Sequence, residues 1–361
     1  MSIYNSNLWL SDLDEVITTL PELVFLSGKS IMITGCNGLI CSAIVDLLIR
    51  WNETHYNNEK IKILAAGRNK VKIESRFAQY SQKEWFMFLP YDATSINSVF
   101  PYDSCDYIIH GASNASPNKI IQEPVETMMS NIIGMKYILD HARKQETKRV
   151  LYISSSEVYG EREANNQNKN DGYGWIDILN PRSSYPSAKR ATETLCASYA
   201  EEYNVESVIV RPGHIYGPTA LETDNRVSST WAYTAARGED IVMKSNGSQI
   251  RSYCYCLDCA SAILTVLLKG DSIHAYNIST PGSIISIREL AEILAKVAGV
   301  SLKKELATEI EKKGFNTMKN SSLDSSELLK LGWKGLFNAN RGFFHTIKVL
   351  REIGNLRRGE I

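Results

Sequence analysis

A strand-length apolar run, followed at once by a glycine turn and a long apolar helix, constrains the fold of this chain more than any other segment. Residues 30–34 are predicted to form a buried strand, and the helix is predicted from about Leu39 to Arg50. Gly35 and Gly38 lie between them, where glycine permits a tight bend and close approach of the backbone to a ligand. The amino-terminal end of such a helix faces an anion such as pyrophosphate. The segment therefore predicts a βαβ unit with a dinucleotide-binding turn.

Similar apolar runs recur along the chain, separated by helical patterns. Further strands are predicted at residues 61–66, 86–89, 107–110, 150–153 and 207–211, and helices at 123–144 and around Tyr185. Short strands that alternate with helices are typical of a parallel sheet. We therefore predict an α/β fold: a Rossmann-like doubly wound parallel sheet at residues 28–211, and a smaller C-terminal substrate-binding lobe at 212–361 that is partly interleaved with it.

Residues 1–27 precede this pattern and are predicted to form an N-terminal extension. Helical spacing from Asp12 to Leu20 indicates a helix, with Ser11 as its cap and Pro21 as its stop. The polar segment Asn165–Asp171 is expected to be a loop over the site.

Composition and charge exclude several classes of protein. The net charge is zero, so the chain carries no electrostatic footprint for nucleic acid or an anionic membrane. No apolar run reaches the roughly 18 residues that a membrane span needs. The first ten residues lack the basic and apolar regions of a signal peptide, and seven cysteines, an odd number, fit a reducing compartment. We therefore expect a cytoplasmic protein.

Three of the cysteines are close in sequence, at Cys254, Cys256 and Cys259. Their spacing matches no usual zinc pattern, so we expect no metal site. Cys254 and Cys256 alternate with Tyr253 and Tyr255, which indicates a half-buried strand with packing cysteines.

A tyrosine and a lysine four residues apart, Tyr185 and Lys189, are the strongest chemical signal in the chain. On a helix they share one face, and a nearby ammonium is expected to lower the tyrosine pKa from about 10 toward neutrality. The pair then forms a general base that removes a proton from a sugar hydroxyl while a hydride leaves the same carbon. A second copy, Tyr56 and Lys60, lies in a polar segment with no catalytic neighbour.

The sequence predicts a dinucleotide cofactor but does not decide between NAD and NADP. Cys41 stands where a third glycine is common, and a side chain of this size still permits packing of the helix on the strand. The second strand ends at Gly67-Arg68 without an acidic residue for the ribose, and Arg68 could meet a 2′-phosphate instead. NAD is expected and NADP is left open. Asp92 either hydrogen-bonds adenine or caps the segment at Thr94.

Several motifs, taken together in order and spacing, resemble the extended short-chain dehydrogenase/reductase family, in its group of nucleotide-sugar epimerases, dehydratases and decarboxylases. The resemblance runs from about Ser30 to Trp333. Beside the glycine turn and the Tyr185–Lys189 pair, the motifs are His110-Gly111-Ala112-Ser113-Asn114-Ala115-Ser116-Pro117, Asn131-Ile132-Ile133-Gly134, Arg211-Pro212-Gly213-His214-Ile215-Tyr216-Gly217-Pro218, Gly247-Ser248-Gln249-Ile250-Arg251-Ser252-Tyr253 and Leu331-Gly332-Trp333.

The resemblance implies roles for particular residues. It makes Ser155, Tyr185 and Lys189 a catalytic trio, with Glu157 beside it. The cofactor-binding residues that it implies are Gly35, Asn37, Gly38, Leu39, Ile40, Arg68, Asp92, Ala93, Ala112, Ser113, Asn131, Tyr185, Lys189 and Pro212, and the substrate-binding residues are Ser116, Ser156, His214, Arg226 and Arg251. His214 departs from the family, where many members have asparagine. Relatives also pair two helices as a two-fold bundle, which implies a homodimer through apolar stripes at Met128, Ile132, Met135, Leu139, Ala191, Leu195, Ala197 and Tyr199.

The residues beside Ser155 separate the possible reactions. The 4,6-dehydratases of this group usually carry Asp before the glutamate as the acid for the departing 6-hydroxyl, whereas this chain has Ser156 before Glu157. Loss of carbon dioxide from a 4-keto uronic acid needs no such acid. The motifs look most like those of UDP-glucuronate decarboxylases, so an NAD-dependent decarboxylation to a nucleotide pentose is predicted. A nucleotide-sugar 4-epimerase, then a 4,6-dehydratase, are the alternatives, and a non-catalytic dinucleotide sensor is disfavoured because a sensor needs no proton relay.

Overall fold

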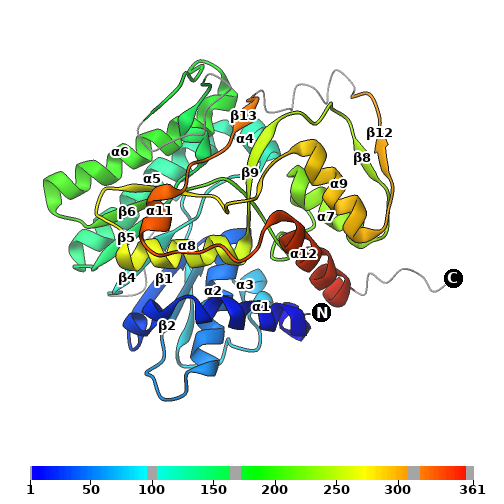
Figure 1. Cartoon of the computed structure of the whole chain (residues 1–361). Coiled ribbons are helices and arrows are strands. Elements are labelled where there is room, and N and C mark those ends of the chain that lie inside the picture. The colour runs from blue at the N-terminus through cyan, green and yellow to red at the C-terminus, as the bar shows by residue number, and fades with distance from the viewer. Residues whose placement is uncertain (1, 96–103, 163–171, 308–317, 355–361) are drawn as a thin grey trace.

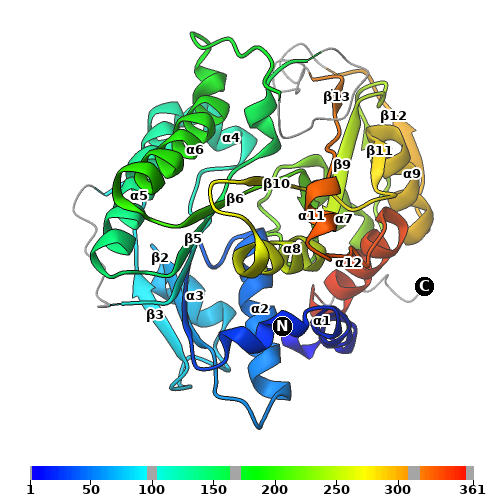
Figure 2. The ribbon, with the colours of Figure 1, turned by 60° about the vertical axis from the view of Figure 1, so that its left-hand side comes forward.

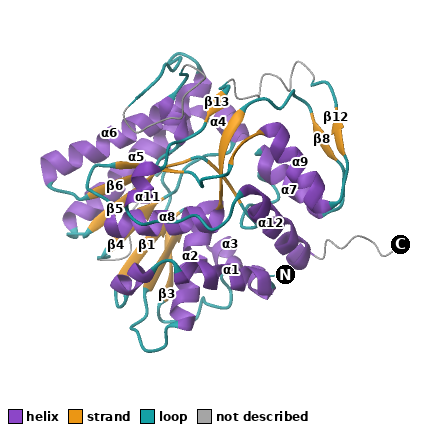
Figure 3. Cartoon of the chain, in the orientation of Figure 1, coloured by secondary structure: helices purple, strands orange, loops and turns teal. Residues whose placement is uncertain are grey.

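A parallel sheet forms the centre of the molecule. The computed structural model describes residues 2–95, 104–162, 172–307 and 318–354. Within these ranges the main sheet has the strand order β10-β6-β5-β4-β1-β2-β3, and every neighbouring pair is parallel. Figures 1 and 3 show this sheet at the centre of the molecule, with β6, β5, β4 and β1 labelled. Its strands are β1 (Ser30–Thr34), β2 (Lys62–Gly67), β3 (Phe86–Pro90), β4 (Tyr107–His110), β5 (Arg149–Ile153), β6 (Ser207–Pro212) and β10 (Ala275–Ile278). The predicted Rossmann-like sheet is confirmed.

Helices cover both faces of this sheet because every central strand is apolar on both sides. Ile31 and Ile33 of β1 belong to one buried core, and Met32 between them belongs to the other. α5 and α6 pack together on one face, and α2 and α8 pack together on the opposite face (Figure 2). The helices of this part are α2 (Leu39–Thr54), α3 (Lys70–Arg76), α4 (Pro117–Gln122), α5 (Pro124–Lys144), α6 (Ser184–Tyr203) and α8 (Cys256–Lys269), with the short 3-10 helices η3 (Ser156–Tyr159) and η4 (Pro181–Ser183).

The later part of the chain builds a second, smaller layer. Its strands are β7 (His214–Tyr216), β8 (Ile241–Met243), β9 (Ile250–Tyr255), β11 (Ile284–Ser286), β12 (Leu302–Lys304) and β13 (Asn320–Ser321), and its helices are α7 (Val227–Ala236), α9 (Ile287–Ala298), α11 (Ser326–Lys330) and α12 (Ala339–Gly354). β9 pairs with β7, β11 and β13, while β8 pairs with β12. α8 and β10 belong by sequence to this part but complete the main α/β layers, so the two parts interleave. The domain boundary at 211/212 stays a prediction.

The N-terminal helix begins earlier than its sequence pattern predicted. α1 spans Asn7–Thr18 and follows the 3-10 helix η1 (Ile3–Asn5), and η2 (Pro21–Leu26) comes after it. Ser6, not Ser11, is the cap: its hydroxyl accepts a hydrogen bond from the amide of Trp9 at 3.1 Å. Trp9 and Leu13 are fully buried, so the apolar stripe of the helix starts before Asp12.

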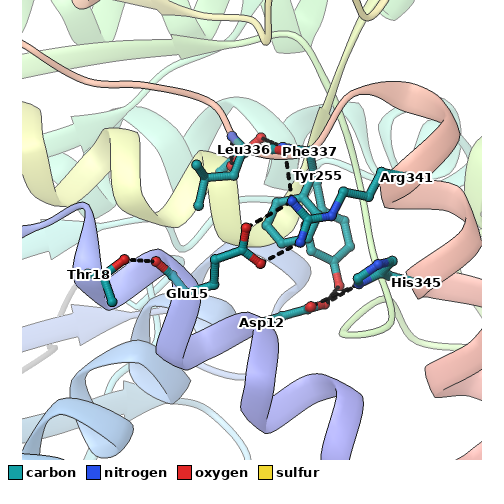
Figure 4. A network of polar contacts seen from close by, with 9 residues as sticks. Asp12, Glu15, Thr18, Tyr255, Leu336, Phe337, Arg341 and His345 are labelled. Carbon is teal, nitrogen blue, oxygen red and sulfur yellow. Dashed lines mark hydrogen bonds and ion pairs between the residues drawn. The ribbon is translucent and has the colours of Figure 1, made fainter.

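Polar contacts fasten α1 to the C-terminal helix α12 (Figure 4). The buried Asp12 carboxylate accepts hydrogen bonds from Nδ1 of His345 at 2.8 Å and from the hydroxyl of Tyr255 at 3.2 Å. One turn further along α1, Glu15 forms a two-bond ion pair with Arg341. The N-terminal extension therefore joins the last helix of the chain to the core that contains α2 and α8.

Two further predictions need correction or fall outside the described residues. β9 is buried on both faces, not one, since Tyr253, Cys254 and Tyr255 are all at most 3 % exposed. Cys256 does not continue the strand, because it is the first residue of α8. The segment Asn165–Asp171, predicted as a loop over the site, lies outside the described residues. Within the described ranges, no helix is long and apolar enough to cross a membrane.

Candidate active site

The glycine turn after β1 has the geometry that close backbone approach requires. Gly35 has a φ of +69°, and a Cβ there would lie 3.0–3.1 Å from backbone atoms of Gly111 and Ala112 after β4. Gly38 then caps α2, which begins at Leu39 as predicted. Asn37 precedes this cap, and Leu39 and Ile40 are the first two residues of the helix.

The turn after β4 is tied to β1 by one side chain. The hydroxyl of Thr34 accepts hydrogen bonds from the amides of Gly111 and Ala112, both at 3.2 Å. Cys41 packs against this turn so closely that a Cβ on Gly111 would lie 2.4 Å from its sulfur. The replacement of a third glycine by Cys41 is therefore accommodated by glycine at position 111.

Two other candidates flank the cofactor turn. Asp92 accepts hydrogen bonds from both the amide and the hydroxyl of Thr94, at 3.0 and 2.8 Å, and its hydrogen bond to adenine stays a prediction. Arg68 is exposed just after β2, and Asn69 caps α3 there by accepting from the amide of Lys72. A cation, with no carboxylate, thus stands at the end of β2.

The remaining cofactor candidates lie after β3, after β4, on α5 and at the end of β6. The buried Asn131 of α5 donates to the carbonyl of Thr127 at 2.7 Å. Ala93 packs against Gly134, where a Cβ would meet it at 2.8 Å. Pro212 ends β6, and the hydroxyl of Ser113 is buried without a hydrogen-bond partner in the structure.

The predicted catalytic pair lies on one face of α6. Tyr185 is 7 % and Lys189 2 % exposed, and the lysine nitrogen lies 5.6 Å from the centre of the tyrosine ring. That nitrogen donates to the carbonyl of Ile153, at the end of β5, at 2.8 Å. Burial lowers the pKa of Lys189 from 10.5 to about 7, and the charge of Glu193 opposes this.

The predicted fall in the pKa of Tyr185 does not occur in this arrangement. Burial raises the pKa of Tyr185 to about 12 and the charge of Glu157 adds to the rise, whereas a hydrogen bond with Ser155 lowers it. The prediction failed because the Lys189 nitrogen is directed to a backbone carbonyl and the phenol is almost completely desolvated. The other copy of the motif is peripheral, with Tyr56 82 % exposed.

Glu157 has a cationic partner that the sequence reading missed. Ser155 caps η3 by accepting from the amide of Glu157 at 3.2 Å, and Ser156 is buried beside it. Arg182 of η4 binds both carboxylate oxygens of Glu157, at 3.0 and 3.1 Å. A cation three residues before Tyr185, at the start of the same helical region, was the available signal.

Substrate-site candidates approach the same point from the second lobe. The charges of Arg226 and Arg182 both oppose the rise in the pKa of Tyr185. Burial lowers the pKa of Arg251, and the charge of Glu157 opposes that fall. Arg226, the cap residue of α7, is itself held by Asp224.

The last two predicted substrate residues also come from loops and strands around this point. His214 of β7 lies beside Tyr253, with ring centres 5.7 Å apart, and burial with nearby Arg251 lowers its pKa to about 3. Its Nδ1 is buried without a partner in the structure. Ser116, at the start of α4, donates to the side chain of Asn225 at 3.2 Å. The structure thus groups Ser155, Glu157 and Tyr185 with Arg182, Arg226, Arg251 and His214.

Comparison with known proteins agrees with this arrangement. The sequence pattern of the NAD dependent epimerase/dehydratase family matches residues 31–279, which is more than half of the chain. The chain belongs to this family. It is also similar to UDP-glucuronic acid decarboxylase 6 of Arabidopsis thaliana, with 32 % identity over 273 residues that cover 76 % of this chain and 75 % of the relative.

Solved structures share the fold of this family member. The UDP-glucose 4-epimerase of Thermotoga maritima superposes with a TM-score of 0.74 and 22 % identity, over 90 % of this chain and 99 % of that one. The dTDP-glucose 4,6-dehydratase of Streptomyces venezuelae superposes with a TM-score of 0.75 and 20 % identity, over 91 % and 100 %.

The residues of this epimerase/dehydratase-family chain fit the NAD on which the family depends. A Cβ would fill the narrow space at Gly35, next to the amino-terminal end of a 16-residue helix. The unpartnered hydroxyl of Ser113, in the turn that packs on Gly35, is a further polar group available to a ligand.

Proposed function

We propose that the protein decarboxylates a nucleotide-linked uronic acid, with UDP-glucuronate as the first candidate, and forms a nucleotide pentose. The observation that carries the proposal is the pair of residues after Ser155. Ser156 stands where water elimination would need an acid, and Glu157 is held as a partner of Arg182. The similarity to a UDP-glucuronic acid decarboxylase supports the same reaction.

The residues divide the work of this reaction between them. NAD, held by the turn after β1, would supply the capacity to accept a hydride from C4 of the sugar and return it. Tyr185 removes the proton of the 4-hydroxyl. Burial and the charge of Glu157 raise its pKa to about 12, and the hydrogen bond with Ser155 and the charges of Arg226 and Arg182 oppose this rise and so favour the phenolate. With C4 oxidised, the bond from C5 to the carboxyl carbon breaks, carbon dioxide leaves, and the electron pair passes into an enolate.

The enolate must then be protonated at C5 and the ketone reduced. Glu157 lies close enough to Tyr185 to raise its pKa, so it is the side chain that we place beside C5, where its carboxylate takes a proton from water and passes it to C5. Tyr185 returns its proton to the oxygen on C4. Arg251 and Arg226, on the second lobe, are assigned to the diphosphate.

Mass spectrometry of the products tests the proposal. The protein is incubated with UDP-glucuronate, UDP-glucose, UDP-GlcNAc, dTDP-glucose and their GDP and CDP counterparts. Loss of carbon dioxide from a uronic acid is expected, whereas loss of water from a hexose would show a dehydratase and unchanged mass with inverted C4 an epimerase.

Two substitutions sharpen this test. Glu157→Gln is expected to slow decarboxylation by at least about a hundredfold, because a neutral amide cannot exchange a proton. Ser156→Asp is expected to slow it as well, because a second carboxylate repels that of the substrate. Full activity of Glu157→Gln on a uronic acid would exclude the role assigned to Glu157, and undiminished decarboxylation by Ser156→Asp would exclude the repulsion assigned to position 156.

We propose further that the protein is a homodimer through α5 and α6. Part of the predicted stripe, Met135, Leu139 and Tyr199, is buried in the chain's own core, but Val125 and Met129 of α5 are 65 % and 42 % exposed. Light scattering at micromolar concentration is expected to give twice the chain mass, and a monodisperse monomer would exclude this assembly. The seven buried free thiols support the cytoplasm as its location.

A further inference from the structure

We propose that Arg182 recognises the carboxylate of the substrate, and that its ion pair with Glu157 opens to admit it. The inference rests on the proposed function, because a uronic acid differs from a hexose in bringing a carboxylate on C5. It makes Arg182 the residue that selects a uronic acid over a neutral sugar.

The Arg182–Glu157 pair has the geometry of a carboxylate-binding site that is already filled by a carboxylate. Two parallel N–H···O bonds of 3.0 and 3.1 Å join the guanidinium to both oxygens of Glu157. The two side chains are 36 % and 26 % exposed, so a ligand from solvent can reach them.

A second arginine–glutamate pair nearby shows the contrast. Arg211 and Glu193 are 2 % and 10 % exposed, and Glu193 also accepts a hydrogen bond from Ser154 at 2.6 Å. Opening that pair would leave a buried charge without a partner, whereas the partly exposed pair at Glu157 can exchange partners at much lower cost.

The position of Arg182 matches that of the group it would recognise. The charges of both Arg182 and Glu157 act on the pKa of Tyr185. If Tyr185 binds the hydroxyl on C4, the carboxylate on C5 lies on neighbouring atoms of the sugar and therefore meets these same two side chains. Beside Glu157 alone this carboxylate would be repelled, so a cation must come between them.

The other two arginines of the site are less suited to this role. Arg226 is held by the carboxylate of Asp224, which the hydroxyl of Ser229 also contacts at 3.1 Å. Arg251 is 3 % exposed and donates to the carbonyl of Ile250 at 2.8 Å. Arg226 is also partly exposed and near Tyr185, but its partner Asp224 is only 10 % exposed, whereas Glu157, the partner of Arg182, is 26 % exposed and can leave the pair for solvent.

Binding measurements with two ligands that differ only at C6 test the proposal. The dissociation constants of UDP-glucuronate and UDP-glucose are measured by calorimetry on the NAD-loaded protein, in a Tyr185→Phe background that prevents turnover. Arg182→Gln is expected to raise the dissociation constant of UDP-glucuronate by about tenfold to a hundredfold and that of UDP-glucose by less than about twofold. Arg182→Lys is expected to fall between, because it keeps the charge but not the two-bond geometry.

Arg237→Gln is the matched control. The Arg237 side chain is 31 % exposed and also pairs with carboxylates, those of Glu222 and Glu239, but on the surface of the second lobe. It is expected to change neither constant. Undiminished binding of UDP-glucose by Arg182→Gln also verifies that this variant is folded.

The outcomes separate this inference from the proposed function. Equal weakening of both ligands by Arg182→Gln, or no weakening of UDP-glucuronate, would overturn the role of Arg182 and show that it only positions Glu157. Absence of carbon dioxide release by the wild-type protein would overturn the proposed reaction, whatever the ratio of the two constants. A protein that binds neither ligand would overturn both.

Discussion

Replacement of the buried Lys189 by methionine is expected to stabilise the folded protein near neutral pH while it removes catalysis. The lysine is 2 % exposed, and burial lowers its pKa from 10.5 to about 7. Its folded-state pKa therefore lies below that of the unfolded chain. Between about pH 7 and 10.5 the unfolded chain binds the additional proton, so wild-type stability rises with pH in this window.

The size of the effect follows from the same shift. At about 1.36 kcal/mol per pKa unit, the buried amine costs roughly 4 kcal/mol at pH 7, roughly 2 kcal/mol at pH 9 and almost nothing above pH 10.5. Methionine has no charge to desolvate, but it loses the 2.8 Å hydrogen bond to the carbonyl of Ile153 and the contact of the amine with the ring of Tyr152. Those losses offset roughly 2–3 kcal/mol, which leaves a net gain of about 1–2 kcal/mol at pH 7.

The pH dependence is the sharper part of this prediction, because the lost contacts cancel from it. Between pH 7 and 9, the stability advantage of Lys189→Met over wild type is expected to shrink by about 2 kcal/mol. Urea unfolding of the NAD-free proteins, followed by the fluorescence of the six tryptophans, measures this difference. Lys72→Met, at an exposed position on α3, is the control and should show no such change. An advantage that stays constant from pH 7 to 9 would refute the buried-amine reasoning.

The other predictions concern the phenol, the extension and the cofactor turn. Tyr185→Phe should lower turnover by about a thousandfold or more with NAD affinity within about twofold, since only the hydroxyl is lost; unchanged turnover would dismiss the catalytic role. Asp12→Ala should lower the free energy of unfolding in urea by about 2–3 kcal/mol, because it leaves the buried donors of Tyr255 and His345 unpaired. Glu15→Ala, at a partly exposed ion pair, should lower it by less than about 1 kcal/mol. The reverse order would contradict the polar contacts between α1 and α12 in Figure 4. Gly111→Ala should lower the free energy of unfolding by about 1–3 kcal/mol in the wild-type protein and by much less in a Cys41→Gly background, because the sulfur of Cys41 is the atom nearest to the new methyl group. Additive effects of the two substitutions in a double-mutant cycle would exclude this contact.

Features that depend on neighbouring residues in the chain could be predicted from the sequence. β1 and β4 have the predicted bounds, and α2 begins at Leu39 as predicted. Apolar runs, glycine turns and helical spacing act locally, so their pattern specifies strands buried on both faces and the turn that faces a dinucleotide. The shared face of Tyr185 and Lys189 follows from helical periodicity in the same way.

Features that depend on contacts between distant segments were decided by the tertiary structure. The cap of α1 is Ser6 because Trp9 and Leu13 find a core against later helices, which local spacing does not reveal. Glu157 lies on η3 and Arg182 on η4, and the packing of both short helices against α6 brings their charges together. The pKa of Tyr185 rises because packing removes water from its hydroxyl and brings the charge of Glu157 near it, while the Lys189 nitrogen donates to the carbonyl of Ile153 instead. Desolvation and the direction of a charged side chain depend on every surrounding segment, so the sequence identifies the reacting groups whereas the fold sets their protonation and their partners.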